Sequence, residues 1–454
     1  MQLNARAVND RRTFEGAVAS PINAEQELRR SIMCCMLWEG GFYESGESIA
    51  DRIAALVPKV RPEFAAACAY EARTKMKLRH APLLVVREMA RLQEHKKLVG
   101  NLLRDVIQRP DEIAEFLAIY WKDGKCPISA QVKKGLAAAF RKFDGYSLAK
   151  YNRDNAIKLR DALFLVHSKP SDAPGDKFTK FERKAGADRI LTDGEALYAG
   201  LVSGTLEAPD TWEVALSGGA DKKETFERLM AEKKLGALAF LRNLRNMAQA
   251  GVDVSQVEGY VDSMKVDRVL PFRFIAAALH VPQWEPIIER AMMRCLDGQE
   301  KLPGRTVLLV DVSGSMDSAL SSKSDMRRTD AAFGLGILLR EVCDQVGIYT
   351  FSNNVVSVPP RRGFALRDAM DHSQSHGGTY LGAAVQAING QIDYDRLIII
   401  TDEQSADQVP APKAKGYVIN IASNRNGIGY GAWNHIDGWS ESVIDFIREF
   451  EVGK

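Results

Sequence analysis

The chain has 454 residues, of which 46% are hydrophobic and 26% charged, and its formal net charge is +2. This is the mix of an ordinary globular protein with two or three domains. No apolar run approaches the roughly 18 residues that would cross a bilayer, and the first residues lack the apolar core of a signal peptide. The six cysteines show no C-x-x-C pair and no zinc spacing. We therefore expect reduced cysteines, no membrane partner and a cytoplasmic protein.

The small net charge hides an uneven distribution. Residues 51–169 hold 24 Lys and Arg against 13 Asp and Glu, a surplus of +11, whereas residues 301–454 hold 15 against 18. Such asymmetry indicates a polyanionic partner for the first half of the chain. The alternative is that these charges only solvate the outer faces of helices.

Residues from about 25 to 290 predict helix after helix. Apolar residues recur at spacings of three and four, and prolines fall at the expected starts and stops. Short connections between helices of about 10–15 residues favour an α-solenoid of paired helices. The segment 170–189, rich in Asp, Lys, Pro and Gly, is expected to be an exposed loop. The predicted helices cover residues 25–38, 49–60, 62–77, 81–93, 98–108, 113–120, 131–143, 222–234, 236–249, 272–280 and 285–296.

After a linker at 297–304 the pattern changes to alternating strands and helices. This alternation is typical of a parallel, doubly wound α/β sheet. Ligands of such sheets bind outside the carboxyl ends of the strands. The predicted strands are 306–311, 346–351, 396–401 and 416–422, and the predicted helices are 330–345, 379–390 and 440–449.

Hard oxygen side chains gather at the ends of two of these strands. They are the predicted metal ligands Asp311, Ser313, Ser315, Thr379 and Asp402. Such a set suits Mg²⁺ or another divalent cation that keeps several waters. The alternative is that Asp311 caps a turn and the serines are ordinary loop residues.

The spacing of these five residues resembles the metal-ion-dependent adhesion site of the von Willebrand factor A domain, D-x-S-x-S followed by a later Thr and Asp. The resemblance implies that Ser313, Ser315 and Thr379 contact Mg²⁺ directly, whereas the two acids often act through water. We expect no enzyme, because a metal hydrolase also needs a base at the bound water. Only Glu403 and His376 are near in sequence.

Two basic stretches stand out in the helical half. In the predicted helix 131–143, spacings of seven and eight residues place four cations on one face. A second stretch carries cations and a histidine, with Tyr146 and Tyr151 interleaved. Cations contact phosphates, and Tyr and His stack on unpaired bases. The predicted RNA-binding residues are Lys133, Lys134, Arg141, Lys142, Lys150, Arg153 and His167.

Three segments of this half resemble the TROVE domain of the Ro autoantigen family. They are Glu-Leu-Arg-Arg-Ser with Glu-Gly-Gly-Phe-Tyr in residues 27–43, the basic stretch 130–153, and Leu-Phe-Leu-Val-His-Ser-Lys-Pro at 163–170. A TROVE half followed by an A domain is also that family's arrangement. The resemblance implies a monomeric ring of HEAT-like helical repeats (residues 20–298) closed by a doubly wound A domain (304–454).

By the same resemblance, the protein would act in noncoding RNA stabilisation and RNA quality control. It would bind a small structured Y-like RNA on the outer ring surface, where Lys150, Arg153 and His167 match the family's contact positions. It would also bind the single-stranded 3′ ends of misfolded RNA in the central hole. Bacterial relatives can tether a 3′ exonuclease, polynucleotide phosphorylase.

A different class of function remains open. The A domain could recruit a carboxylate-bearing protein partner through Mg²⁺, with the helices serving only as a scaffold. A metal-assisted nuclease is the least favoured alternative, because the carboxylates that would hold two metals are missing.

Overall fold

The computed structural model divides the chain into two compact units. One, here the helical unit, is Ile53–Asp210, and the other, here the A-domain unit, joins Met1–Arg52 to Thr211–Lys454. The structure describes residues 12–33, 45–152, 156–170, 191–266, 269, 271–298, 300–322, 324–422, 424, 426–438, 440 and 442–452.

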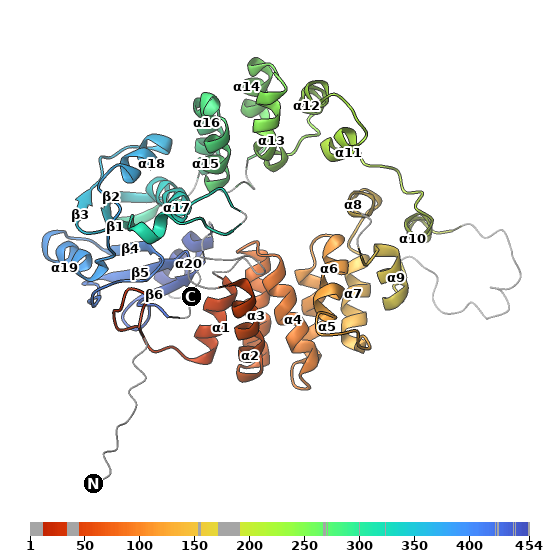
Figure 1. Ribbon diagram of the computed structural model, residues 1–454, viewed down its shortest axis with the longest axis horizontal. Helices are drawn as coiled ribbons and strands as arrows, with labels where there is room; N and C mark the ends of the chain where they lie inside the picture. Colours follow the sequence, from red (N-terminus) through yellow and green to blue (C-terminus); the bar gives the residue numbers. More distant parts are fainter. Residues whose placement is uncertain are drawn as a thin grey trace, which may run out of the picture. The chain divides into compact units, whose positions relative to one another are not determined.

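The helical unit consists of short helices, each of which packs on helices that are near it in sequence. Helix α3 packs on α4 and α5, α5 packs on α7, and α7 packs on α9 (Figure 1). Contacts limited to nearby helices are typical of helical-repeat proteins. The elements are the end of α2 (Gly46–Leu56), η1 (Val57–Lys59), α3 (Pro62–Thr74), α4 (His80–Arg91), α5 (Lys96–Val106), α6 (Asp111–Tyr120), α7 (Ala130–Phe140), α8 (Gly145–Tyr151), α9 (Leu159–Val166) and α10 (Asp193–Ser203).

Two features hold the centre of the helical unit together. A β-carbon on Gly135 would lie 2.7 Å from the carbonyl oxygen of Gly100, so α5 and α7 approach at a point where only glycine fits. Arg73 and Glu112 form a buried ion pair, with 2.7 Å between Nη2 and Oε1. Glu112 also accepts the backbone N–H of Gln108 at 2.7 Å, so this buried charge is both paired and hydrogen-bonded.

The helices of the A-domain unit share a core with its sheet. Buried side chains of α12 to α16 join those of α17 in one continuous hydrophobic cluster, and α15 packs directly on α17. The helices are α1 (Ala24–Met33), α11 (Trp212–Ser217), α12 (Lys222–Ala231), α13 (Ala237–Gln249), α14 (Val254–Ser263), α15 (Pro271–His280), η2 (Pro282–Trp284) and α16 (Glu285–Leu296).

The sheet has six strands in the order β3-β2-β1-β4-β5-β6, all parallel except β3. Because side chains alternate along a strand, Leu308 and Val310 face the core shared with α17, α18 and α20, whereas Leu309 packs on α19. The elements are β1 (Leu302–Asp311), η3 (Gly314–Asp317), α17 (Arg328–Val342), β2 (Cys343–Phe351), β3 (Val355–Ser357), α18 (Gly363–Asp371), α19 (Leu381–Gln391), β4 (Arg396–Thr401), β5 (Lys415–Asn420), β6 (Asn434–Asp437) and α20 (Ser442–Val452).

The structure confirms the predicted fold class, a helix-rich half and a doubly wound A-type half. The sheet is not purely parallel, because β3 returns as a short antiparallel edge strand. The predicted helix 131–143 is α7 and ends at Phe140, and the predicted helix 25–38 is described as far as Met33. Most of the predicted loop 170–189 lies outside the described residues. Closure of the helices into a ring and the predicted domain boundaries at 298 and 304 stay predictions.

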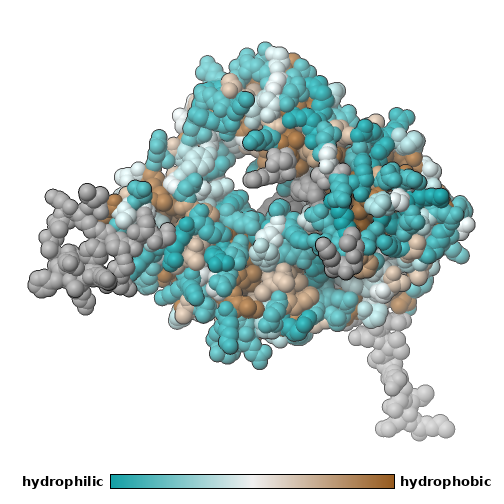
Figure 2. Space-filling model, turned by 180° about the vertical axis from the view of Figure 1, so that it is seen from behind, coloured by the Kyte–Doolittle hydropathy of each residue, from teal (hydrophilic) through white to brown (hydrophobic). Residues whose placement is uncertain are grey.

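The surface in view in Figure 2 is mainly hydrophilic, with hydrophobic residues in scattered patches. Among the helices that the structure describes, none is both long enough and apolar enough to span a membrane.

The close contact of α5 and α7 makes a testable prediction. Gly135→Ala should destabilise the protein by about 1–3 kcal/mol, because the added methyl group meets backbone and side-chain atoms that cannot withdraw. Urea unfolding would measure this change. Gly259→Ala on α14 is the matched control, since its β-carbon would meet nothing within 4 Å. Gly259→Ala should leave the free energy of unfolding unchanged or increase it. If both variants lost the same free energy of unfolding, the close contact of α5 and α7 would not explain the effect of Gly135→Ala.

Candidate metal centre and basic surface

Strands β1 and β4 bring the two predicted acidic ligands to one edge of the sheet. The strands pair in register, Val310 beside Ile400, so Asp311 ends β1 where Thr401 ends β4. The Thr401 hydroxyl donates to Asp311 Oδ2 at 2.6 Å, and the Ser313 backbone N–H donates to Asp311 Oδ1 at 2.8 Å. The Asp311 carboxylate is thus fixed at the end of its strand.

The hydroxyls of the D-x-S-x-S loop join this edge. Ser313 Oγ lies 3.3 Å from Ser315 Oγ, and Ser315 Oγ donates to Asp402 Oδ2 at 2.8 Å. A serine hydroxyl that gives its proton to a carboxylate keeps lone pairs for a metal ion. The structure therefore brings Asp311, Ser313, Ser315 and Asp402 together.

The loop that carries Thr379 is tied to both of these segments. Gly314 N–H donates to Gly377 O at 2.8 Å, and Ala406 N–H donates to Thr379 O at 2.8 Å. Thr379 is buried. The fifth predicted ligand thus sits on a loop held between the D-x-S-x-S loop and the segment that follows Asp402.

The charges at this edge suit a divalent cation. Asp311 and Asp402 are both fully buried, and burial together with the charge of Asp402 raises the pKa of Asp311 to about 7. A bound cation would relieve that repulsion. The donors are all hard oxygens, as Mg²⁺ prefers. The described residues hold no group of three or more His, Cys, Asp or Glu placed to bind a metal, so a metal ion at this edge would need the hydroxyls of Ser313, Ser315 and Thr379 as well.

Neither His376 nor Glu403, the two residues near the site that were considered as a catalytic base, is free to accept a proton from a metal-bound water. His376 Nδ1 lies 2.7 Å from Asp317 Oδ2, and its Nε2 lies 3.0 Å from the Asp371 carbonyl oxygen. Burial opposes ionisation of Glu403, but Arg30 and His435 outweigh burial and lower the pKa of Glu403 to about 2. A carboxylate so strongly held in its charged form is a poor proton acceptor at neutral pH.

A buried ion network beside the metal site was not predicted from the sequence. Arg30 of α1 pairs with Glu403, and His435 Nε2 lies 2.7 Å from the other Glu403 oxygen. His435 Nδ1 lies 3.4 Å from Asp437 Oδ2, and Tyr430 stacks on the imidazole with 4.0 Å between ring centroids. The network joins α1 to β6 and to the residue after Asp402.

The backbone of the N-terminal segment follows the same route. Thr13 Oγ1 donates to Ser405 O at 2.7 Å, and Ser20 N–H donates to Gly427 O at 2.9 Å. Residues 12–33 thus pack along the loops that flank the metal edge. No local sequence pattern indicates these contacts, because they join residues almost 400 positions apart.

In the helical unit, arginines and lysines have different roles. Several arginines pair with carboxylates, whereas three of the lysines predicted to bind RNA do not. The pairs are Arg73–Glu112, Arg79–Asp111, Arg87–Asp123, Arg91–Asp123, Arg104–Asp105 and Arg109–Asp111. Within the described part of the chain, Lys133, Lys134 and Lys150 have no carboxylate within 4 Å.

Aromatic rings accompany one of these lysines. Lys150 Nζ lies 5.9 Å from the ring centroids of both Tyr146 and Tyr151, and Tyr146 is 53% exposed. Arg109 covers Tyr151 at 4.5 Å. We give the name basic surface to Lys133 and Lys134 of α7 together with Lys150 and Tyr146 of α8, and that these four residues bind one RNA is part of the proposal below.

The other predicted RNA-binding residues have different positions. Because α7 ends at Phe140, the helical-face argument does not extend to Arg141 and Lys142. Arg141 donates to Lys169 O at 3.1 Å, and the Lys142 ammonium donates to Arg104 O at 2.6 Å and to Ile107 O. Lys142 therefore caps the last turn of α5, and burial lowers its pKa.

His167 ends helix α9 and is exposed. It adopts a left-handed backbone conformation (φ 53°), which is uncommon outside glycine. The neighbouring Ser168 hydroxyl donates to Ala137 O at 3.1 Å, which ties this corner to α7. Phe164, one turn before His167, is 60% exposed and was not predicted. Arg153 lies outside the described residues.

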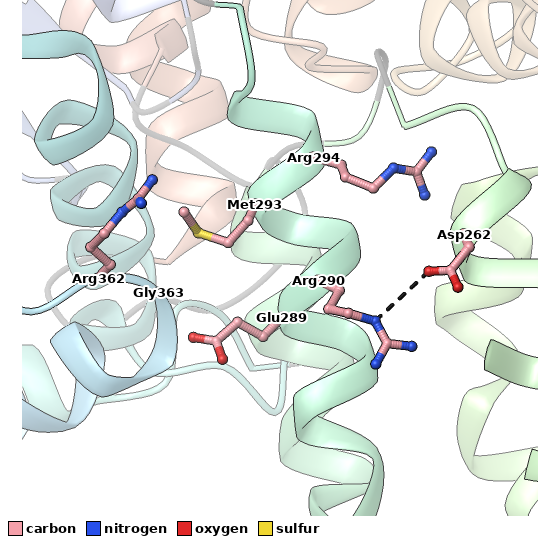
Figure 3. A pocket seen from close by; sticks show the side chains of 7 residues that line it. All are labelled: Asp262, Glu289, Arg290, Met293, Arg294, Arg362 and Gly363. Carbon is pink, nitrogen blue, oxygen red and sulfur yellow. Dashed lines mark ion pairs between the residues drawn. The ribbon is translucent and has the colours of Figure 1, made fainter.

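A separate cavity of about 490 Å³ in the A-domain unit is lined by three arginines (Figure 3). Two of them have structural roles. Arg294 Nη2 donates to Met264 O at 3.0 Å, and Arg362 makes a two-pronged pair with Glu341 at 2.6 and 2.9 Å. Arg290 has the looser partners Glu258 and Asp262, at 3.9 and 3.7 Å. These arginines hold helices together.

Comparisons with known proteins agree with this architecture. Residues 199–295 match the TROVE domain family, and residues 306–404 match the von Willebrand factor type A domain family. The TROVE match lies downstream of the three segments that suggested that family. Both domain types that the sequence predicted are thus matched, each over part of the chain.

The solved structures include a similar fold over nearly the whole chain. The crystal structure of the Deinococcus radiodurans Ro (RSR) protein superposes with a TM-score of 0.60 at 19% sequence identity, covering 95% of this chain and 100% of that one. No curated protein matches the chain in sequence. The two domain matches and the shared fold support the predicted resemblance to Ro-like proteins. A domains of this type generally carry a divalent cation site.

The hydroxyl pair at the sheet edge supports a prediction about metal binding. Ser315→Ala should weaken Mn²⁺ binding about tenfold or more, because it removes a ligand and the hydrogen bond that orients Asp402. Electron paramagnetic resonance of free Mn²⁺ measures the affinity. Ser318→Ala is the control, since its hydroxyl is not among the five predicted ligands. Equal affinities for the two variants would argue against the site.

The buried network supports a prediction about pH. Burial opposes protonation of His435, but Asp437 and Glu403 outweigh burial and raise its pKa to about 9. The stabilisation from the charged imidazole is therefore complete below its unfolded pKa of about 6.5 and is lost as the pH rises through 9. The shift corresponds to about 3 kcal/mol, as an order of magnitude.

The melting temperature of the protein should therefore fall between pH 6.5 and 9. His435→Gln should melt lower at pH 6.5, and the difference from the wild type should shrink by pH 9 to 10. Differential scanning calorimetry at each pH measures both. His372→Gln on an exposed histidine is the control. A constant gap between His435→Gln and wild type across this range would show that the imidazole is not charged in the folded state.

Proposed function

We propose that the protein is a non-enzymatic, Ro-like RNA-binding protein that contacts RNA through the basic surface. The observation that carries the proposal is the division of charges in the helical unit. Several of its arginines are paired with carboxylates, whereas Lys133, Lys134 and Lys150 on α7 and α8 are not, and Lys150 lies beside the exposed Tyr146. Lysine ammonium groups neutralise phosphates without reading sequence, and tyrosine stacks on unpaired bases.

The finer features of the proposal come from the family resemblance. The RNA would be a small structured Y-like RNA bound on the outer surface, with Arg153 and His167 adding to the contacts. Single-stranded 3′ ends of misfolded RNA would enter the hole of a monomeric ring closed by the A domain. Polynucleotide phosphorylase would be the nuclease partner, and the cytoplasm the compartment.

The metal centre would hold Mg²⁺. Ser313, Ser315 and Thr379 would hold the ion, and Asp311 and Asp402 would orient its waters and supply negative charge. When bound, the ion supplies a Lewis-acidic position for an oxygen ligand. The chain's own residues fix the loops around that position through the backbone bonds of Gly314 and Ala406.

A second function is favoured by this centre. A bound Mg²⁺ that is held by only a few protein oxygens keeps coordination positions for water, and one of these positions suits a carboxylate from a protein partner. Pull-down with and without EDTA separates the two functions. Loss of a protein partner on chelation would support this scaffold function, whereas RNA binding that survives chelation would show that RNA is bound without the metal.

The basic surface can be tested by removing its three lysines. The variant Lys133→Ala/Lys134→Ala/Lys150→Ala should bind a structured RNA at least about tenfold more weakly near 0.15 M salt. Its plot of log affinity against log salt should be less steep by about 2, since each lost contact with single-stranded phosphates contributes about 0.7. Filter binding across a salt series measures both quantities.

The control removes three cations elsewhere, in Lys222→Ala/Lys265→Ala/Arg361→Ala, all of which are exposed. This variant has the same net charge as the test variant. If both variants lost the same affinity, overall charge and not the basic surface would explain binding. An unchanged affinity in the test variant would refute the surface.

A further inference from the structure

One cation beside the metal centre belongs to neither the predicted ligand set nor the hydroxyl network. Arg328 is 3% exposed, and its Nη1 lies 3.2 Å from Asp402 Oδ2 and 3.5 Å from Ser315 O. The same Oδ2 accepts the proton of the Ser315 hydroxyl. Asp402 is therefore shared by a guanidinium and by the hydroxyl of a predicted metal ligand.

The position of Arg328 in its helix is unfavourable without this partner. It is the first residue of α17, and the amino-terminal turn of a helix favours negative charge because unpaired backbone N–H groups point outward there. A buried arginine at this position needs a compensating carboxylate. Asp402 supplies this carboxylate. A cation at the start of a helix departs from the usual preference for acidic residues there, and such departures are expected at functional sites.

The charges then decide what the site can bind. Asp311 and Asp402 contribute two negative charges, and Arg328 cancels one of them. A divalent cation added to this set leaves a net charge of +1, whereas without Arg328 the loaded site would be neutral. Ser315 and Arg328 both donate hydrogen bonds to Asp402 Oδ2. This oxygen is therefore better placed to orient the groups that hold the metal than to bind the metal directly.

We propose that Arg328 tunes the A-domain centre toward anionic ligands. It weakens binding of the divalent cation and strengthens binding of a carboxylate to the loaded site. The inference rests on the metal site proposed above. It defines the partner of that site as an anion, and it makes Arg328 a positioning residue that acts through Asp402.

The test compares the wild type with Arg328→Gln, which removes the charge, and with Arg328→Lys, which keeps it. The probe is Mn²⁺ alone, followed by electron paramagnetic resonance. Arg328→Gln should bind Mn²⁺ about fivefold or more tightly than the wild type, because one repulsive charge is gone. Arg328→Lys should stay within about twofold of the wild type. A merely structural arginine predicts the opposite result, weaker Mn²⁺ binding in Arg328→Gln.

Acetate is the anionic probe in a second measurement. When acetate replaces water on bound Mn²⁺, the relaxation rate of water protons falls. The wild type should reach half of this fall at an acetate concentration about fivefold or more below that of Arg328→Gln. Equal acetate midpoints, or a lower midpoint in the variant, would overturn the proposal.

A metal-free measurement keeps the outcomes separate. In EDTA, Arg328→Gln should have a lower melting temperature than the wild type and Arg328→Lys, because the two buried carboxylates lose their cation. Excess Mn²⁺ should raise the melting temperature of Arg328→Gln more than that of the wild type. If the wild type bound no Mn²⁺, the metal site itself would be refuted. If it bound Mn²⁺ with the same affinity as Arg328→Gln, only the role of Arg328 would be refuted.

Discussion

The organisation of the A-domain unit depends on how it neutralises carboxylates that its fold buries. The parallel pairing of β1 and β4 ends both strands at the same edge, where Asp311 and Asp402 have no exposure to water. Buried charges of one sign are costly unless cations or hydrogen bonds compensate them. Thr401, the Ser313 backbone, Ser315 and Arg328 supply that compensation from within the chain. A metal ion would add to a framework that is already fixed.

The same constraint extends one residue further along the chain. Glu403 follows Asp402 and is also fully buried, but its counter-charges are Arg30 and His435. Its backbone lies at φ 62°, a conformation that non-glycine residues rarely adopt, so neighbouring contacts must hold it there. Gly427 and Gly429 make room for this cluster, since a β-carbon on either would meet the Glu403 carboxylate. The first helix of the chain is thereby attached to the segment that carries a predicted metal ligand.

These details also explain what the sequence could and could not predict. An apolar strand followed by an acid is a local pattern, so the shared edge of Asp311 and Asp402 and the doubly wound sheet were predictable, whereas metal binding at that edge stays a prediction. The partner of Glu403 was not, because Arg30 is 373 positions away and only the folded chain brings the two together. Arg141 and Lys142 were placed on a helical face for a related reason. The periodicity continues past Phe140, whereas the Lys142 ammonium turns back to cap the carbonyl groups that end α5.

The two basic residue types divide their roles in the helical unit for a physical reason. A guanidinium is planar and can pair with a carboxylate while it also donates to backbone carbonyls, as Arg73 does with Glu112 and Val106. An ammonium on a flexible stem is better suited to a partner whose position varies, such as the phosphates of an RNA backbone. Lys133, Lys134 and Lys150 are among the described lysines of the first half of the chain that have no carboxylate within 4 Å. We therefore expect the positive charge that this unit offers to RNA to come from lysines that, like Lys133, Lys134 and Lys150, have no carboxylate partner.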